Sequence, residues 1–394
     1  MLTSTFPRWE GDNEPSFVLE LCRRLAATFD VRVLAPHAPG ARPYEILDGV
    51  TVIRFRYFFG WGEKLAYQGG ILANLRRNRL CFLLVPLFLF FQLAALVRLL
   101  SRDKFDVVHA HWLIPQGLVA VAAKLLVRGA PALVCTAHGS DLYRLQGRLF
   151  SALKRLVMRN SDAVTVVSGA MKDHAVALGV APEKISVISM GVDAANIFTP
   201  AGRPVRHDNE LLFVGRLIAQ KGLELLVRAL PHVISAHPDT TLTIVGRGPQ
   251  EKNLRGLSEA LGVGQNVKFL GAVANEKLPE FYRDSAVLIF PSESDEGFGL
   301  VCAEALACEC PVVASDLAAV REIVSDGETG LLFRRGDSDD LARKILALLS
   351  DQALRDSLGK AGREFVSQRF DWQIVSGRYC ELLSRSMALK GQSA

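Results

Sequence analysis

The chain lacks several signals that would place it in a specialised class of protein. Its seven cysteines are an odd number and have no zinc-finger spacing, so neither a disulfide scaffold nor a structural zinc site is predicted. We expect reduced, buried thiols and a cytoplasmic protein. No short-period repeat and no low-complexity segment interrupts the sequence. We expect no signal peptide, since residues 1–3 lead directly into a strand-end loop, and we expect a few strand residues to precede Met1.

Acidic residues are scarce in the first half of the chain. Residues 1–200 contain 23 Lys and Arg against 15 Asp and Glu, a net charge of +8, whereas residues 201–394 contain 23 against 26, a net charge of −3. The basic half predicts an anionic partner or a membrane surface, and the alternative is ordinary variation of surface charge. We expect no nucleic-acid partner. A chain of 394 residues with 49% apolar content predicts two globular domains.

The longest run without a charged side chain is residues 80–97. These 18 residues carry no charge and approach the length of a membrane span. We reject a span, because the strands expected on either side belong to one sheet and would lie on opposite sides of a bilayer. Two alternatives remain, a helix buried against the sheet and a helix lying in the membrane interface. The cluster Arg76, Arg77 and Arg79 favours the second, at the inner face of the cytoplasmic membrane.

Apolar runs of strand length alternate with helical patterns along most of the chain. This alternation predicts parallel sheets covered by helices on both faces, with ligands at the carboxyl ends of the strands. A polar linker at 199–210 separates two such series. We therefore predict an α/β fold with two Rossmann-like domains, residues 1–200 and 201–370, whose parallel sheets face an inter-domain cleft.

The segment 291–312 combines a glycine-containing loop with a helix from Leu300 onward. A helix that starts after such a loop offers free N–H groups and the positive end of the helix dipole, which suits a phosphate. Glu296 lies in the loop, and Glu304 lies in the second helical turn, where side chains lean toward the N-terminus. Carboxylates repel phosphate but accept hydrogen bonds from vicinal hydroxyls, so this pair predicts a ribose or another sugar nearby.

Two cations follow the first expected strand of the second domain. Gly215 permits a tight turn, and Arg216 offers a planar fork for phosphate oxygens. Lys221 stands at a helix start, where the dipole disfavours a cation unless an anion is bound. Together they predict a diphosphate site, and the alternative is a pair of solvated surface cations. The G-x-G-P turn that begins at Gly246 has no third glycine, so it is a weak nucleotide signal.

Histidines gather at the expected strand ends of the first domain. His109 and His111 end one strand, and His138 ends the next. No evident carboxylate completes a metal site with them, so we expect no metal ion. We predict that His138 is a polar group that faces the cleft near the reacting sugar. The acids at 337–340 precede a helix, and helix capping explains them.

Taken together, these motifs resemble the retaining nucleotide-sugar glycosyltransferases of family 4, which have the two-domain GT-B fold. Glu296 and Glu304, separated by seven residues, are similar to that family's paired glutamates. The resemblance covers essentially the whole chain. It rests also on Val-Gly-Arg…Lys-Gly at 214–222, Gly-x-Gly-Pro at 246–249, Asp-Gly-Glu-Thr-Gly at 326–330, Met-Gly-Val-Asp at 190–193, Asp-Val-Val-His-Ala-His-Trp at 106–112 and Thr-Ala-His-Gly-Ser-Asp at 136–141.

The resemblance implies a retaining transfer of a hexose-type sugar from a UDP- or GDP-sugar to a saccharide or lipid-linked acceptor, without a metal or other cofactor, in surface polysaccharide or glycolipid synthesis. Arg216 and Lys221 would bind the diphosphate, Glu304 the ribose and Glu296 the transferred sugar, which His138 would line. His138, Arg216, Lys221 and Glu296 are thus the candidate catalytic residues. The expected donor contacts are Gly215, Arg216, Lys221, Gly246, Glu296, Gly297, Phe298, Gly299, Leu300 and Glu304. A C-terminal helix at about 371–394 would cross back onto the first domain.

The sequence departs from the family pattern in three places. The loop at 11–15 has one glycine and acids where the family has a glycine-rich loop, Glu309 replaces a usual glycine, and Ala318-Ala319 replaces Gly-Gly. A sugar-nucleotide epimerase or a phosphorylase of the same fold is an alternative function, although no pyridoxal-phosphate lysine for a phosphorylase is evident. The third alternative is a catalytically silent, membrane-associated homologue.

Overall fold

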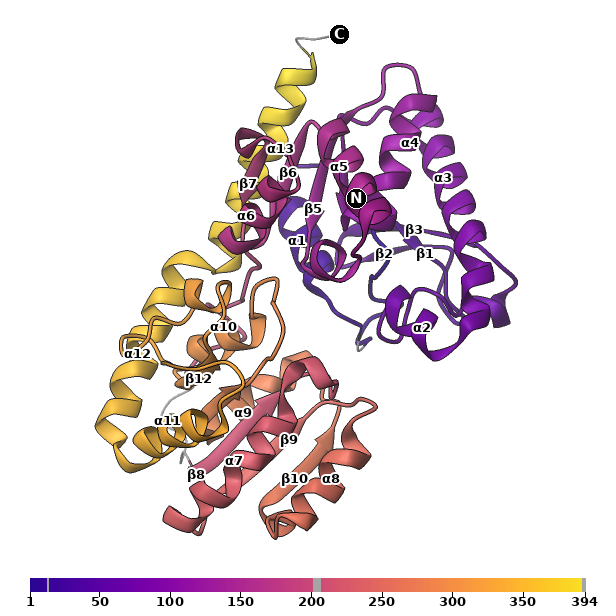
Figure 1. Cartoon of the computed structure of the whole chain (residues 1–394). Coiled ribbons are helices and arrows are strands. Elements are labelled where there is room, and N and C mark those ends of the chain that lie inside the picture. The colour runs from indigo at the N-terminus through magenta and orange to yellow at the C-terminus, as the bar shows by residue number, and fades with distance from the viewer. Residues whose placement is uncertain (13, 201–206, 392–394) are drawn as a thin grey trace. The chain divides into compact units, whose positions relative to one another are not determined.

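The computed structural model describes residues 1–12, 14–200 and 207–391. Residues 201–206 of the expected linker, Asn13 and the last three residues of the expected C-terminal helix lie outside the described residues. The chain forms two compact units (Figure 1). Unit 1 comprises Met1–Ser189 and Val375–Ala394, and unit 2 comprises Met190–Ile374.

The sheet of unit 1 consists of two pieces that a single residue joins. β1 (Arg32–Pro36) pairs in parallel with β3 (Val50–Phe55), which pairs in antiparallel with β2 (Tyr44–Leu47). Leu2 forms parallel bridges with both Leu34 of β1 and Ala110 of β4, so residues around Leu2 take the place of a short strand between the two pieces. The second piece is parallel throughout and runs in the order β4 (Val107–His111), β5 (Ala132–Ala137), β6 (Ala163–Val166) and β7 (Ile185–Val187).

Helices cover the sheet of unit 1 because they present apolar side chains at helical spacing. α1 (Phe17–Leu25) buries Val18 and Cys22 in a cluster that also contains Val33 and Val50. The other helices of this unit that lie between the strands are α2 (Ile71–Arg77), α3 (Leu84–Arg102), α4 (Leu118–Leu126), α5 (Arg148–Asn160) and α6 (Gly169–Ala177). A 3₁₀ turn, η2 (Arg79–Leu83), leads into α3.

Unit 2 contains a six-stranded sheet with parallel pairing throughout its described strands. Its order is β10 (Val267–Gly271), β9 (Thr241–Val245), β8 (His207–Val214), β11 (Ser285–Phe290), β12 (Val312–Ser315) and β13 (Leu331–Phe333). Numbered within the unit, this order is 3-2-1-4-5-6, that of a Rossmann fold. β11 is buried at every position, which explains its continuous apolar run.

The helices of unit 2 bury leucine, valine and isoleucine side chains against both faces of that sheet. Leu226 and Leu230 of α7, for example, belong to the same core cluster as Leu341 and Ile345 of α11. The helices are α7 (Leu223–Ala236), α8 (Glu251–Ala260), α9 (Leu278–Asp284), α10 (Leu300–Ala307), α11 (Ser338–Ser350) and α12 (Gln352–Arg369).

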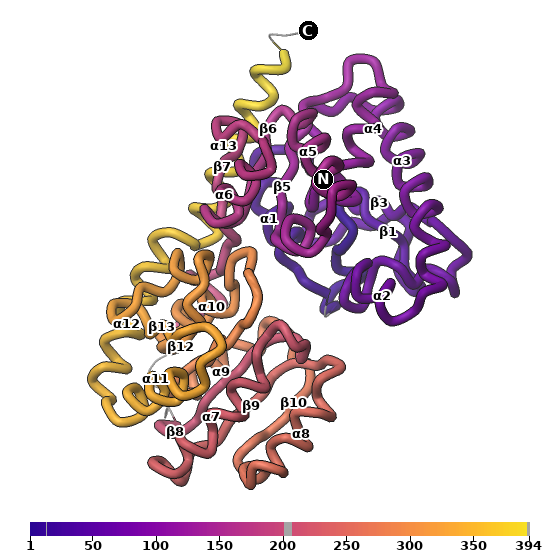
Figure 2. Tube along the Cα trace, in the orientation of Figure 1, coloured from indigo at the N-terminus to yellow at the C-terminus, as the bar shows by residue number. Residues whose placement is uncertain are grey.

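The chain leaves unit 1 at Ser189, before the linker expected at 199–210. The Val192 amide donates to the Phe370 carbonyl (2.8 Å), and the Trp372 amide donates to the Val192 carbonyl (3.0 Å). These bonds tie the segment after Ser189 to the end of unit 2. The last helix, α13 (Trp372–Gly391), begins in unit 2 and belongs to unit 1 from Val375 onward; Figure 2 traces it in yellow.

The α/β fold with parallel sheets is confirmed, and most expected strands and helices occur within a few residues of their predicted bounds. The capping role of the acids at 337–340 is also confirmed, since the Asp337 side chain accepts hydrogen bonds from the Asp339 and Asp340 amides. The sequence pattern did not predict β2, α2, β13 and α12. In α12 the buried stripe includes Gly359 and Gly362, which give almost no apolar signal.

Candidate active site

The predicted donor residues of unit 2 gather where its strand order reverses. β8 and β11 are neighbours in the sheet although two strands and three helices separate them in the chain. The connections from these two strands leave in opposite directions at this point, which opens a crevice at their carboxyl ends. Gly215, Arg216 and Lys221 follow β8, Gly246 follows β9, and residues 296–304 follow β11.

Close backbone contacts fix the loops at this edge of the sheet. Gly222 has φ of +66°, and a Cβ there would lie 1.8 Å from the Pro291 carbonyl oxygen. A Cβ at Gly246 would lie 1.8 Å from the Gly215 carbonyl oxygen. The Glu293 amide donates to the Gln220 carbonyl (2.9 Å), so the loop after β11 is tied to the loop after β8. Glycine is therefore required at both positions by close approach of the backbone.

A cation and a carboxylate from these two loops form an ion pair. Lys221 Nζ lies 2.7 Å from Glu296 Oε1, and both side chains are about one-fifth exposed or less, at 20% and 17%. The Ser292 hydroxyl donates to the same Glu296 oxygen at 2.5 Å. Lys221 Nζ also lies 5.1 Å from the ring centre of Phe290, the last residue of β11. Two predicted site residues are thus in direct contact, and the ammonium group still has N–H groups for an anion.

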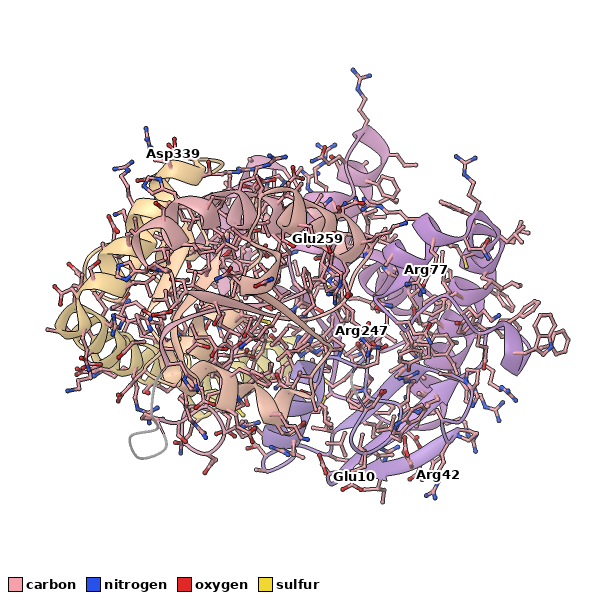
Figure 3. All side chains as sticks on the ribbon, turned by 90° about the horizontal axis from the view of Figure 1, so that it is seen from below. Glu10, Arg42, Arg77, Arg247, Glu259 and Asp339 are labelled. Atoms are coloured by element: carbon pink, nitrogen blue, oxygen red, sulfur yellow. The ribbon has the colours of Figure 1, made fainter. Side chains whose placement is uncertain are left out.

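Arg216 is exposed and forms no hydrogen bond or ion pair through its guanidinium within the described residues. The residue after it is tied to the loop that follows β9, since the Leu217 amide donates to the Arg247 carbonyl (3.0 Å). Figure 3 shows the side chain of Arg247, which the sequence motifs did not single out. An unpaired guanidinium at a strand end is available to a phosphate.

The N-terminus of α10 is open to a ligand. Its N-cap residue is Gly299, with φ of +116°, and no side chain caps the first turn. The amide groups at the helix start and the dipole therefore favour an anion, and the donor contact of Leu300 stays a prediction. Phe298 is different, because its ring is buried and packs at 5.1 Å against Phe370. The Phe298 side chain therefore supports the loop, and only its backbone is free to contact a donor.

Glu304 has different surroundings from Glu296. It is 4% exposed, and its Oε2 accepts a hydrogen bond from the Tyr282 hydroxyl of α9 (2.8 Å). Burial raises the pKa of Glu304 to about 7, while the Tyr282 bond acts in the opposite direction. Tyr282 is a positioning residue that the sequence motifs did not reveal. Its only signal was a tyrosine within an apolar helix, where a buried hydroxyl requires a partner.

His138, the remaining predicted site residue, lies in unit 1 among aromatic rings. Its Nε2 lies 3.0 Å from His111 Nδ1, and its ring centre is 5.0 Å from those of both Phe17 and Trp112. Burial lowers the pKa of His138 to about 3, so the ring is neutral at pH 7. Its Nδ1 is buried without a hydrogen-bond partner in the described part of the chain. A neutral imidazole of this kind donates or accepts a hydrogen bond but carries no charge.

The other two strand-end histidines, His109 and His111, contact His138, each other and a threonine. His109 Nε2 lies 2.6 Å from the Thr136 hydroxyl, which lies 2.5 Å from the Thr165 hydroxyl. Among the described residues no group of three or more His, Cys, Asp or Glu side chains is arranged to hold a metal ion. Asp141 completes the loop geometry by accepting hydrogen bonds from the amides of Leu113 (2.7 Å) and His138 (3.1 Å).

The N-terminal loop that departs from the family pattern holds its acid in an ion pair. Arg8 donates to Asp12 through Nε (2.8 Å) and Nη2 (2.6 Å). The Asp12 charge is therefore compensated within the loop.

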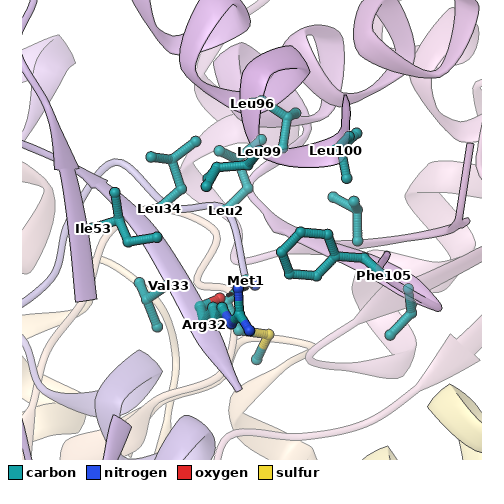
Figure 4. Close-up of a pocket in the computed structure, with 12 residues that line it drawn as sticks. Met1, Leu2, Arg32, Val33, Leu34, Ile53, Leu96, Leu99, Leu100 and Phe105 are labelled. Carbon is teal, nitrogen blue, oxygen red and sulfur yellow. Dashed lines mark hydrogen bonds between the residues drawn. The ribbon is translucent and has the colours of Figure 1, made fainter. Parts of the chain in front are cut away.

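A small apolar pocket of about 30 Å³ lies elsewhere in unit 1, beside Met1 and beneath α3 (Figure 4). It is lined by Leu34, Leu96 and Phe105 among others and contains none of the predicted site residues.

Models of known protein families match both halves of the chain. Residues 16–196 match the model "Glycosyltransferase Family 4", and residues 200–365 match the model "Glycosyl transferases group 1". A glycogen synthase of Mycobacterium tuberculosis is 34% identical over 280 residues, which are 69% of this chain and 66% of that protein. This chain thus spans slightly less than two thirds of that relative. A phosphatidyl-myo-inositol mannosyltransferase of Mycolicibacterium smegmatis is 30% identical, over 92% of this chain and 87% of that protein.

Solved structures agree with the fold. Sucrose-phosphate synthase from Thermosynechococcus elongatus has a TM-score of 0.78 at 25% identity and covers 95% of this chain and 93% of its own. HepE of Anabaena, in complex with UDP and glucose, has a TM-score of 0.75 at 21% identity, with 98% and 99% covered. The family models, the mannosyltransferase and the strand order of unit 2 agree, and the chain therefore belongs to the group 1 glycosyltransferases of family 4, with the GT-B fold.

Proposed function

We propose that this chain is a retaining glycosyltransferase that moves a hexose-type sugar from a UDP- or GDP-sugar to a saccharide or lipid-linked acceptor. The observation that carries the proposal is the Lys221–Glu296 pair beside the uncapped start of α10, at the point where β8 and β11 diverge. Cations and amides there suit a diphosphate, whereas Glu296 and Glu304 suit hydroxyl groups. One small region thus offers both chemistries that a nucleotide-sugar needs.

The proposed reaction exchanges one bond at the anomeric carbon of the sugar. The bond from this carbon to the diphosphate oxygen breaks, and the acceptor oxygen forms a bond to the same face of the carbon. The acceptor hydroxyl gives its proton to the leaving diphosphate. Arg216, Lys221 and the N-terminus of α10 stabilise the negative charge that develops on this leaving group. The proposal assigns no covalent nucleophile and no metal ion to the reaction.

The relatives support the classes of donor and acceptor. HepE was solved with UDP and glucose, and another relative, from Mycolicibacterium smegmatis, is described as a GDP-mannose-dependent mannosyltransferase. That relative and the phosphatidyl-myo-inositol mannosyltransferase are named for lipid-linked acceptors, while glycogen synthase is named for a polysaccharide. We propose the same classes for this chain, with a role in surface polysaccharide or glycolipid synthesis and His138 beside the transferred sugar.

We further propose that the reaction takes place in the cytoplasm. All seven cysteines are free thiols, and six of them are buried. Buried free thiols suit a reducing compartment, where nothing selects for disulfides. Expression with a periplasmic leader would test this, since a cytoplasmic protein with unpaired thiols should lose activity there and a protein adapted to oxidising conditions should not.

A thermal-shift screen across UDP-, GDP-, ADP- and TDP-sugars tests the donor. A ligand that binds only the native state stabilises it by about 2.7 kcal/mol at a hundredfold excess over its Kd. We expect one UDP- or GDP-sugar to raise the Tm by several degrees and the corresponding nucleotide to raise it less. No response to any nucleotide-sugar would contradict the proposal. Isomerisation of the donor without acceptor would instead identify an epimerase.

A further inference from the structure

The outer face of α3 is apolar and uncovered. Only Phe88, Gln92 and Leu96 of this helix are buried, and they form a single narrow stripe at every fourth position. Phe88 anchors the stripe, with ring centres of Phe55 and Tyr57 at 5.2 and 5.1 Å. Of the most apolar 18-residue stretch within Arg79–Arg102, 22% is buried. A helix that packed into a protein core would bury most of its apolar side chains.

The exposed face of α3 continues into neighbouring turns. At the start of α3, Leu83 is 72% exposed, and on the helix itself Phe90 is 64% exposed. Exposed apolar side chains also come from η2 and from the turn that follows β3, close to Tyr57 in the chain. We call the following set the apolar patch: Phe59, Trp61, Leu80, Phe82, Leu83 and Phe90. Monomeric soluble proteins rarely expose so many large apolar side chains within one stretch of chain, here residues 59–90, which marks an interaction surface.

The exposed charges next to the apolar patch in the chain have one sign, since Glu63, two residues after Trp61, is buried and pairs with His37. Residues 64–102 contain six Lys and Arg and no Asp or Glu. Arg76, Arg77 and Arg79 are exposed or partly exposed and stand immediately before the apolar part of η2 and α3. Arg77, labelled in Figure 3, lies in the last turn of α2. Apolar residues flanked by arginines without neighbouring acids are the composition that suits an anionic lipid surface.

We propose that the apolar patch docks this protein on an anionic lipid membrane, with α3 lying in the plane of the interface. Leu83, Phe90 and Trp61 would enter the boundary between headgroups and acyl chains, and the arginines would contact lipid phosphates. α3 does not span the bilayer, because β3 before it and β4 after it belong to the same unit and Phe88 is packed against β3. Phe90 projects from α3, and Phe59 and Trp61 project from the turn after β3. Projecting side chains of this kind suit a fluid surface better than a shaped protein groove.

This inference goes beyond the proposed sugar transfer and does not depend on the donor. It states where the protein is located and which side of unit 1 faces the lipid. A docked unit 1 would bring the enzyme to acceptors that are themselves held in a membrane. Binding to vesicles and binding to nucleotide-sugars are measured separately, so failure of either proposal leaves the other testable.

Vesicle flotation of the full chain tests the docking surface. The vesicles are phosphatidylcholine alone or phosphatidylcholine with one third phosphatidylglycerol. We expect binding to the anionic vesicles that weakens with salt.

Arg76→Ser, Arg77→Ser and Arg79→Ser combined should reduce the affinity by about fivefold for each arginine. Leu83→Ser with Phe90→Ser should reduce it at least about tenfold. In wild type, vesicles should shift Trp61 fluorescence to shorter wavelength, and Trp61→Phe should remove that shift.

A matched control is Val187→Ser with Leu270→Ser, two exposed apolar residues on β7 and β10. β7 is the last strand of the sheet piece that begins with β4, and β10 belongs to unit 2, so this variant should bind vesicles like wild type. Circular dichroism and Tm show whether each variant is folded. Equal vesicle binding by the patch variants and the control would overturn the proposal. So would a wild-type dimer in sedimentation without lipid that Leu83→Ser with Phe90→Ser converts to a monomer.

Discussion

Unit 1 buries histidines at its strand ends, whereas unit 2 places charged side chains there. His109 and His111 end β4 with 1% exposure each, and their buried rings remain neutral. At the corresponding edge of unit 2, Lys221 and Glu296 form an ion pair that retains some contact with solvent. The two units thus share a parallel α/β design but differ in charge at the functional edge. A neutral edge suits a sugar and its hydroxyls, and a charged edge suits a diphosphate.

The largest effect should come from removing the cations of unit 2. Arg216→Ala and Lys221→Ala should each reduce kcat/KM for transfer by roughly 10²- to 10³-fold, because in the proposed mechanism each removes a group that stabilises the leaving diphosphate. Steady-state kinetics with the donor found by thermal shift measures this. Arg228→Ala is the control, since Arg228 lies on the exposed side of α7 and pairs with Glu224. If both site variants react at the wild-type rate, Arg216 and Lys221 do not contribute to catalysis.

Acidification should destabilise unit 1 before unit 2. Burial lowers the pKa of His109 and of His138 to about 3, and it lowers the pKa of His111 well below its usual value. In the unfolded chain the pKa of these rings is about 6.5, so unfolding takes up protons below that pH. Stability is therefore fully present above pH 6.5 and falls as the pH drops from there toward 3. The loss is at most about 1.4 kcal/mol for each pH unit and each histidine.

Hydrogen exchange measured by mass spectrometry reports amide protection in each unit separately as the pH is lowered. The amides of β4 and β5 should lose protection between pH 6.5 and 5 after correction for the intrinsic exchange rate. Those of β8 and β9 serve as the internal control. In unit 2 the raised pKa of Glu304 acts with the opposite sign, since its native state binds a proton that the unfolded chain releases between about pH 4.5 and 7. Equal loss of protection in both units would contradict the comparison.

A smaller effect is expected from the buried carboxyl group of unit 2. If Glu304 holds the ribose as proposed, its pKa of about 7 predicts that donor affinity rises with pH through 7, because a carboxylate accepts hydrogen bonds from hydroxyls when it is ionised. Tyr282→Phe removes a bond that favours the ionised form, so the midpoint of this pH dependence should move upward. If it rises by about one pH unit, binding at pH 7 should weaken by up to roughly tenfold. Titration calorimetry of the nucleotide from pH 5.5 to 8.5 measures both quantities.

Two variants complete that test. Glu304→Gln should bind more weakly and lose the pH dependence, since the amide does not titrate. Tyr44→Phe removes a tyrosine hydroxyl from β2, where Tyr44 is 61% exposed, so it should leave the profile unchanged. An unchanged midpoint in Tyr282→Phe would show that Tyr282 does not position Glu304.

The smallest effect concerns two departures from the family pattern. Glu309 has φ of +58°, in the left-handed region, which explains why a glycine is usual there. Glu309→Gly should raise the free energy of unfolding by about 1 kcal/mol. Ala319 has φ of −71°, so Ala319→Gly should instead lower it by about 0.5–1 kcal/mol. Urea unfolding of both variants measures whether each substitution raises or lowers the free energy of unfolding. An increase for Ala319→Gly would contradict this explanation.

Much of this architecture could be predicted from local pattern. The apolar runs of β5, β9 and α9 gave their bounds directly, because a buried strand or helix face leaves a periodic record in the sequence. The strand-end positions of Arg216, Lys221 and His138 followed from the same pattern. Leu2 could not be placed this way, since its two bridges join residues far away in the chain and one residue carries no periodicity. The exposure of α3 was equally hidden, because an apolar helix has the same sequence whether it is covered or not.

By itself, the sequence determined the alternation of strands and helices, the parallel sheets and the set of charged and polar residues at their carboxyl ends. The spacing of apolar side chains along the chain is a local property, so strands and helices can be recognised from it. Only the tertiary structure decided which of those residues meet. Lys221 and Glu296 are 75 residues apart, and Tyr282 on α9 reaches Glu304 on α10. Such contacts depend on loops that hold their partners within hydrogen-bond distance, and this follows from the packing of the whole unit.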